Sequence, residues 1–128
     1  MTNEEINKII AKFRGWVEYH PTPESISKGY PSYSYWTPPR DSKQFAENWG
    51  KLEMDYPPDY CNNLNAMAEA KNLLTGDKRR EFIEYLYEIV KQDKNINAGP
   101  YSVMIEAFYA TAKQQAIAFV KTIGKWKD

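Results

Sequence analysis

Proline restricts where this chain can form regular secondary structure. Seven of its eight prolines lie within residues 20–58, and proline disrupts helix interiors and central strands because it lacks a backbone N–H and its ring clashes with the preceding turn. The same segment is rich in tyrosine and tryptophan, whereas disordered linkers contain few aromatic residues. We therefore expect residues 20–58 to pack as an irregular covering layer or to supply edge strands, with the longer helices on either side.

The flanking residues show helical periodicity. Thr2 and Glu5 have the spacing of a capping box before a helix over 3–14, and Gly15 is a predicted left-handed stop. A second helix is expected to be capped by Asp59 or one of the asparagines after it and closed by Gly76. A third is predicted over 78–92, with Thr75 and Asp77 as alternative caps, and a fourth begins after Thr111 and ends at Gly124. The expected apolar faces are Ile6, Ile9, Ile10, Phe13 and Val17; Leu64, Met67, Leu73 and Leu74; Phe82, Ile83, Leu86, Ile89 and Val90; and Ala112, Ala116, Phe119, Val120 and Ile123.

Strands are predicted in three short segments. Residues 16–19 and 33–37 are rich in strand-forming residues before prolines, and residues 101–109 alternate with the period of a strand. Residues 42–52 are expected to form one or two helical turns, and residues 93–100 a loop. Helices before and after a small sheet predict the α+β class, a small antiparallel sheet packed with about four helices. The length of 128 residues predicts a single layered domain over 1–128.

Composition argues against several classes of protein. Seventeen basic and seventeen acidic residues cancel, whereas a general nucleic-acid binder needs a positive excess. Residues 1–70 nevertheless hold seven basic and ten acidic side chains, and residues 71–128 hold ten and seven, so association between copies of the chain is plausible through complementary patches. The apolar runs are too short to cross a bilayer, and the polar N-terminus does not resemble a secretion signal. A single cysteine, Cys61, predicts a buried thiol in a reducing cytosol.

The sequence offers little that resembles catalytic machinery. His20 is the only histidine, it lies beside prolines, and no serine elbow motif accompanies it. No carboxylate or histidine pair has the spacing of a metal site, and no glycine-rich phosphate loop is present, so we expect no metal and no cofactor. The enzymatic alternative is a hydrolase that uses carboxylates alone. We expect a protein that binds without catalysing a reaction.

Candidate binding residues lie near the predicted helix starts. The stretch "YPPDYCNNLNAM", residues 56–67, is interpreted first as a helix entry, in which Tyr60 packs back as a staple. Alternatively its side chains hold an anionic or amide-bearing ligand at the helix N-terminus, where backbone amides point outward. Arginine side chains can fork onto phosphate, and amides can bind polar edges. The candidate ligand-binding residues are Tyr60, Asn62, Asn65, Arg40, Arg79, Thr111, Gln114 and Gln115.

Three blocks of the sequence resemble a known group. The segments "INKIIAKFRGW" (6–16), "DYCNNLNAMAEAKNLLT" (59–75) and "ATAKQQAIAFVKTIGKW" (110–126) are similar to small phage and prophage proteins called ABA-sandwich-like, most of which have no assigned activity. More weakly, the chain is similar to the Thoeris anti-defence sponge proteins, which sequester cyclic ADP-ribose-type or cyclic oligonucleotide signals as symmetric oligomers. Asn63 replaces an acidic residue usual in the group, and Gln115 replaces an arginine that would provide a phosphate fork.

This resemblance implies a phage or prophage protein that acts in the host cytoplasm. Together with the lack of catalytic motifs, it predicts a non-enzymatic homo-oligomer that counters host defence by sequestering a small, cyclic nucleotide signal. The alternative is an interaction module that inhibits a host or phage protein through the aromatic, proline-rich residues 20–58, because tyrosine and tryptophan are effective interface anchors.

Overall fold

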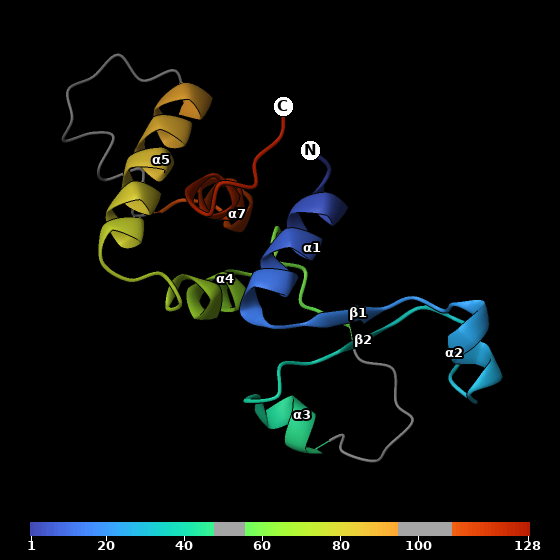
Figure 1. The fold of residues 1–128 in the computed structure, drawn as a ribbon. Helices are drawn as coiled ribbons and strands as arrows, with labels where there is room; N and C mark the ends of the chain where they lie inside the picture. The colour runs from blue at the N-terminus through green and yellow to red at the C-terminus, as the bar shows by residue number, and fades with distance from the viewer. Residues whose placement is uncertain (48–55, 95–108) are drawn as a thin grey trace. The chain divides into compact units, whose positions relative to one another are not determined.

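The structure is a computed structural model that describes residues 1–47, 56–94 and 109–128 (Figure 1). The chain divides into two compact units, one formed by Met1–Ile10 with Pro58–Asp128 and the other by Ala11–Pro57. Helices build the first unit, and short helices with a two-stranded antiparallel sheet build the second. The chain is therefore α+β, as predicted. The single-domain assignment stays a prediction.

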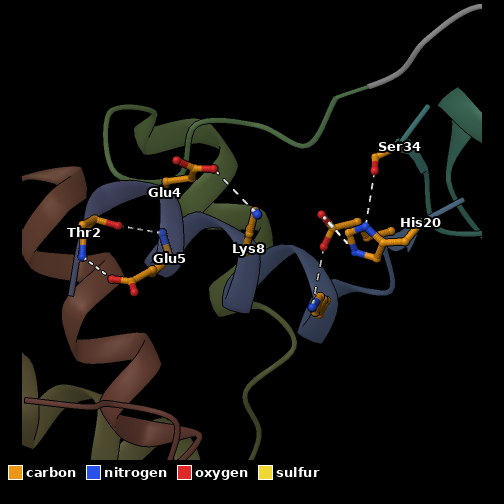
Figure 2. A network of polar contacts seen from close by, with 8 residues as sticks. Thr2, Glu4, Glu5, Lys8, His20 and Ser34 are labelled. Carbon is orange, nitrogen blue, oxygen red and sulfur yellow. Dashed lines mark hydrogen bonds and ion pairs between the residues drawn. The ribbon is translucent and has the colours of Figure 1, made fainter.

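Helix α1 (Asn3–Arg14) has the bounds expected from the sequence. The Thr2 amide donates to Glu5 Oε2 at 2.6 Å, and the Glu5 amide donates to Thr2 Oγ1 at 3.2 Å (Figure 2). Thr2 lowers the pKa of the Glu5 carboxyl, because its backbone amide and then its side chain hydrogen-bond to that group and favour the carboxylate. After the helix, Gly15 has a φ of +112°, which confirms the predicted left-handed stop.

Helix α7 (Ala112–Thr122) is the most deeply buried helix of the first unit. It contacts α5 and α4, and none of its residues is exposed. A helix with so wide a buried face must be enclosed by neighbouring elements. Its buried residues are Ala112, Gln115, Ala116, Ala118, Phe119, Val120 and Thr122.

Helix α5 (Asp77–Lys94), which contacts α7, is longer than the predicted 78–92. Its buried apolar residues are Phe82, Leu86, Ile89 and Val90, which recur at positions i, i+4, i+7 and i+8 of one helical face. The prediction that Ile83 joins this face is wrong, because 61% of its surface is exposed. Ile83 is one residue from Phe82 and so projects about 100° around the helix from it.

Helix α4 (Leu64–Lys71) buries Ala66, Met67 and Ala70, which confirms Met67 as part of the predicted apolar face. Leu64 and Leu73 are both exposed, which contradicts their assignment to the apolar face. The helix ends at Lys71 with Asn72 as its C-cap, well before the predicted stop at Gly76. Leu73 therefore lies in the following turn, whereas Leu74 is buried there.

The sheet of the second unit pairs β1 (Val17–Tyr19) with β2 (Tyr35–Thr37) in antiparallel register. Both strands fall within the predicted segments 16–19 and 33–37. Glu18 lies opposite Trp36, and Tyr19 lies opposite Tyr35. Because side chains alternate along each strand, one face carries Tyr19 and Tyr35, and the other carries Glu18 and Trp36.

Two short helices complete the described part of the second unit. Helix α2 (Pro23–Ser27) is not predicted from periodicity, although its start has a local signal: Thr22 and Ser25 form a capping box around a proline at the first helical position. Helix α3 (Lys43–Glu47) confirms one of the turns expected over 42–52. The predicted strand 101–109 lies outside the described residues except for Tyr109, which is in a turn. Of the predicted loop 93–100, residues 95–100 also lie outside the described residues.

Within the described ranges, no helix combines the length and the apolar character that crossing a membrane requires.

Phe119 is the largest fully buried side chain of the described residues, with an exposed fraction of 0%. Phe119→Ala should lower the free energy of unfolding by about 3–5 kcal/mol, because it removes apolar contacts and leaves a cavity. Ile83→Ala on α5 is the matched control and should cost less than about 0.5 kcal/mol. Urea denaturation measures both, and equal losses would show that the burial pattern is wrong.

Candidate functional site

The asparagine-rich stretch before α4 is a helix entry. Asn63 is the N-cap, and its side-chain Oδ1 accepts a hydrogen bond from the Ala66 amide at 3.0 Å. Asparagine is among the strongest N-cap residues because its short side chain reaches an amide that has no partner inside the helix. The cap is therefore one of the asparagines, and not Asp59.

Asp59 instead holds the approach to α4 against α1. Its two carboxylate oxygens accept hydrogen bonds from Asn7 Nδ2 and Asn62 Nδ2, both at 2.8 Å. Asn7 Oδ1 in turn accepts from the Cys61 amide at 3.0 Å. The bonds from Asn62 and then Asn7 lower the pKa of the Asp59 carboxyl, because they favour its charged form. These amides are occupied by partners within the protein.

The three predicted ligand contacts of this stretch do not form one open site. Tyr60 is only 2% exposed, which agrees with the packing interpretation and leaves no free ring face for stacking. Asn62 is exposed, but its amide donates to Asp59. Asn65 is exposed on the first turn of α4. Of the three, Asn65 is the one whose position suits contact with a ligand.

The start of α7 is capped by its own side chains. Thr111 Oγ1 accepts from the Gln114 amide at 3.1 Å, and Gln114 Oε1 accepts from the Thr111 amide at 2.9 Å, which confirms the predicted capping box. Gln114 Nε2 also donates to Asp93 Oδ2 of α5 at 3.0 Å. Buried Gln115 donates from Nε2 to the Ala110 carbonyl at 3.0 Å, and its Oε1 accepts no hydrogen bond from the described residues. The side chains of Thr111, Gln114 and Gln115 therefore make hydrogen bonds that stabilise the folded protein.

The two predicted phosphate contacts belong to different units. Arg79 is exposed near the start of α5 in the first unit. Arg40 is exposed in the second unit, after β2. Each side chain is accessible to solvent within its own unit.

Burial limits the reactivity of the single thiol. Cys61 is buried, and this burial raises the pKa of its thiol, which keeps the sulfur in its less nucleophilic protonated form. Within residues 1–47, 56–94 and 109–128, no three histidine, cysteine, aspartate or glutamate residues are grouped so that they could hold a metal ion.

A tyrosine cluster, defined here as Tyr19, Tyr30, Tyr33 and Tyr35, is the largest aromatic grouping in the described second unit. The ring centroids of Tyr19 and Tyr35 are 4.6 Å apart, those of Tyr19 and Tyr30 are 6.4 Å apart, and those of Tyr33 and Tyr35 are 6.3 Å apart. Burial, followed by the nearby phenols, raises the pKa of Tyr35. Tyr30 and Tyr33 are 56% and 50% exposed, so the cluster opens to solvent.

Hydrogen bonds fix the base of the tyrosine cluster. The Tyr19 hydroxyl lies 2.7 Å from Ser25 Oγ and donates to the Pro31 carbonyl at 3.0 Å. These contacts join β1 to α2 and to the chain before β2. The rings therefore rest on a hydrogen-bonded scaffold, which lowers the entropic cost of binding a partner.

The opposite face of the sheet brings together polar residues that the sequence analysis did not connect. His20 Nε2 lies 3.4 Å from Glu18 Oε1, and His20 Nδ1 lies 3.3 Å from Ser34 Oγ (Figure 2). The sequence predicts strands over 16–19 and 33–37, next to His20 and around Ser34, but it does not pair them. Without the register, neither residue identifies the other as its partner.

Comparisons of the chain with protein-family models, curated proteins and solved structures give no significant match.

Asn63→Ala should lower the free energy of unfolding by about 1 kcal/mol, because the Ala66 amide loses its capping acceptor. Asn65→Ala is the matched control two residues later and should be neutral or slightly stabilising, since alanine favours helix interiors. Thermal and urea unfolding of both variants measure the difference. Equal destabilisation would contradict the assignment of Asn63 as the cap.

Asp59→Asn should reduce stability at neutral pH and lose this effect in acid. The pKa of Asp59 is lowered by folding, so its contribution is present above the ordinary value of about 3.9 and is lost as pH falls below it. Unfolding free energies measured from about pH 7 to pH 3 should therefore converge for the wild type and the variant. A constant difference across this range would contradict the proposed role of the carboxylate.

Proposed function

We propose that this chain is a non-enzymatic binding protein that contacts a partner protein through the tyrosine cluster. The single observation that carries the proposal is the exposure of Tyr30 and Tyr33 beside the more buried rings of Tyr19 and Tyr35. Tyrosines are enriched among the residues that dominate protein interfaces, because they bury a large apolar ring and keep a hydroxyl for hydrogen bonding. The scaffold beneath them reduces the ordering needed on binding.

The resemblance to phage and prophage proteins supplies the biological setting of this proposal. A protein of that group would act in the host cytoplasm. Inhibition of a host or phage protein there is the interaction alternative that the aromatic, proline-rich residues 20–58 suggest. Three residues of the tyrosine cluster, Tyr30, Tyr33 and Tyr35, lie in the first part of the aromatic, proline-rich segment 20–58, and Tyr19 directly precedes this segment. The geometry thus supports this alternative more than a site at the helix N-termini.

Sequestration of a small cyclic nucleotide is the second candidate function. The exposed rings of Tyr30 and Tyr33 favour it, because an aromatic face can stack on a nucleobase and contribute about 1–3 kcal/mol. The original candidate residues give this function less support, since Tyr60 is buried and Asn62, Gln114 and Gln115 are engaged within the protein. Asn65, Arg40 and Arg79 remain accessible for polar contacts to such a ligand.

Self-association remains part of both proposals. The net charges of the two parts of the sequence have opposite signs, which would favour contact between complementary surfaces of two copies. Native mass spectrometry of the purified chain tests this point directly, because it reports the number of subunits and any retained small molecule together. A monomer at micromolar concentration and low salt would contradict the proposed homo-oligomer.

The binding surface is tested by the double variant Tyr30→Ser/Tyr33→Ser. Affinity for a partner recovered from the host and then purified should fall by at least about 30-fold, corresponding to about 2 kcal/mol for the loss of interface anchors. Leu64→Ser is the matched control, because Leu64 is also an exposed apolar residue but lies on α4 of the first unit. Calorimetry measures all three proteins, and equal affinity of the double variant and the wild type would reject the proposed surface.

A thermal-shift experiment separates the two functions. Cyclic ADP-ribose isomers and cyclic di- and trinucleotides in excess should leave the melting temperature unchanged if the partner is a protein, and raise it by several degrees if a nucleotide is held tightly. Any bound nucleotide should be recovered intact after heat denaturation. Recovery of an altered nucleotide would contradict a non-enzymatic role.

A further inference from the structure

On the face of the sheet opposite the tyrosine cluster, the Glu18 carboxylate, the His20 imidazole and the Ser34 hydroxyl lie next to one another in that order. The strand register pairs Tyr19 with Tyr35. His20 follows Tyr19 at the end of β1, and Ser34 precedes Tyr35 at the start of β2. Their side chains meet at 3.3 Å, and Glu18 lies 3.4 Å from the other nitrogen of the same imidazole (Figure 2). One histidine therefore bridges a carboxylate and a serine.

Burial differs between the two ends of this arrangement. The Glu18 side chain is only 10% exposed, while the His20 side chain is 64% exposed, and Ser34 is exposed. The second oxygen of Glu18 lies 3.7 Å from Lys12 Nζ, which also helps to fix the carboxylate. The acid is thus held within the protein, and the hydroxyl faces solvent and is accessible to a small reagent.

The contacts select one tautomer of neutral His20. A carboxylate only accepts hydrogen bonds, so the imidazole proton belongs on Nε2, facing Glu18 Oε1. Nδ1 then has its lone pair directed at Ser34 Oγ and can accept the hydroxyl proton. This arrangement has the chemical elements of an activated nucleophile, in which a base contacts the hydroxyl and a third group orients the base.

We propose that Ser34 is an acyl-acceptor site that takes an acyl group from a small, activated ester. Ser34 Oγ attacks the carbonyl carbon while its proton passes to His20 Nδ1. The tetrahedral intermediate collapses, the ester C–O bond breaks, and the departing oxygen takes the proton from His20. The products are an ester on Ser34, the free alcohol of the reagent and neutral His20. Glu18 acts as a positioning residue, because it holds the imidazole through Nε2.

This inference goes beyond the proposed binding function and does not depend on it. It describes a single acyl transfer to the protein, that is, a modification site, and requires no release of the acyl group afterwards. The acceptor lies on the face of the sheet opposite Tyr19 and Tyr35, so an acyl group there leaves the rings accessible. Loss of partner binding in the tyrosine variant and loss of acylation in a Ser34 variant are therefore separate outcomes.

The test uses p-nitrophenyl acetate with the full-length protein. Release of p-nitrophenol gives the total rate, and peptide mapping by mass spectrometry gives the rate at each serine. Ser34 should be acetylated about 10- to 100-fold faster than Ser32, an exposed serine in the same loop, which is at or below the usual contribution of a positioned general base. Equal rates at Ser34 and Ser32 would overturn the proposal.

Two variants assign the roles of the neighbours. His20→Asn should reduce acetylation of Ser34 to the rate of Ser32, because the base is lost. Glu18→Gln should lower the Ser34 rate several-fold but keep the dependence on pH, since His20 is still the base. Ser32→Ala is the matched control and should leave the Ser34 rate unchanged. Circular dichroism and melting temperature confirm that each variant is folded.

The pH dependence distinguishes a base from a structural contact. In the wild type the Ser34 rate should rise as pH increases, because a general base must be unprotonated to accept the hydroxyl proton. The groups that face His20 are Glu18 and Ser34, with Lys12 beyond Glu18. In His20→Asn this rise should disappear. A folded His20→Asn protein with the wild-type rate and pH profile would overturn the proposal.

Discussion

Packing around α7 is the constraint on which the first unit depends. Its buried residues cover so much of the helix that α5 and α4 must lie against it, and Phe119 has no contact with solvent. Alanines on α7 contribute little side-chain volume and therefore permit close approach of the neighbouring helices. The capping boxes of α1 and α7 and the asparagine cap of α4 supply the hydrogen bonds that the helix starts need. Polar residues at these starts consequently have structural partners before any ligand is considered.

Hydrogen bonds within the protein also explain why few side chains of the asparagine-rich stretch 56–67 are available to a ligand. Asp59 draws the amides of Asn7 and Asn62 into one network, and Asn63 caps α4. A polar side chain that satisfies a buried or terminal backbone group would leave that group without a partner if it turned toward a ligand. Exposed residues that do not cap a helix or bind a backbone group, such as Asn65, are better placed to bind a ligand. The exposed tyrosines of the second unit carry no such hydrogen-bonding role at a helix start, and the proposed binding surface is placed there for this reason.

The two-stranded sheet gives that surface two chemically different faces. Alternation along β1 and β2 directs Tyr19 and Tyr35 to one side and Glu18 to the other, where it meets His20. A shift of one residue in register would mix the two sets and separate His20 from Ser34. The tyrosine face suits contact with a partner, and the polar face suits proton transfer. Both properties follow from the pairing of two segments that are each only three residues long.

The sequence by itself determined the bounds of α1, the positions of both described strands, the capping boxes of α1 and α7 and the α+β class, because these depend on neighbouring residues and on short-range periodicity. It also placed Cys61 in the interior. Only the tertiary structure decided that Ile83, Leu64 and Leu73 face solvent, because apolar periodicity marks the possible faces of a helix but not how much of each a neighbour covers. It also decided that His20 meets Ser34, since that contact requires the strand register, and that Tyr60 is buried, since burial is set by the elements packed around it.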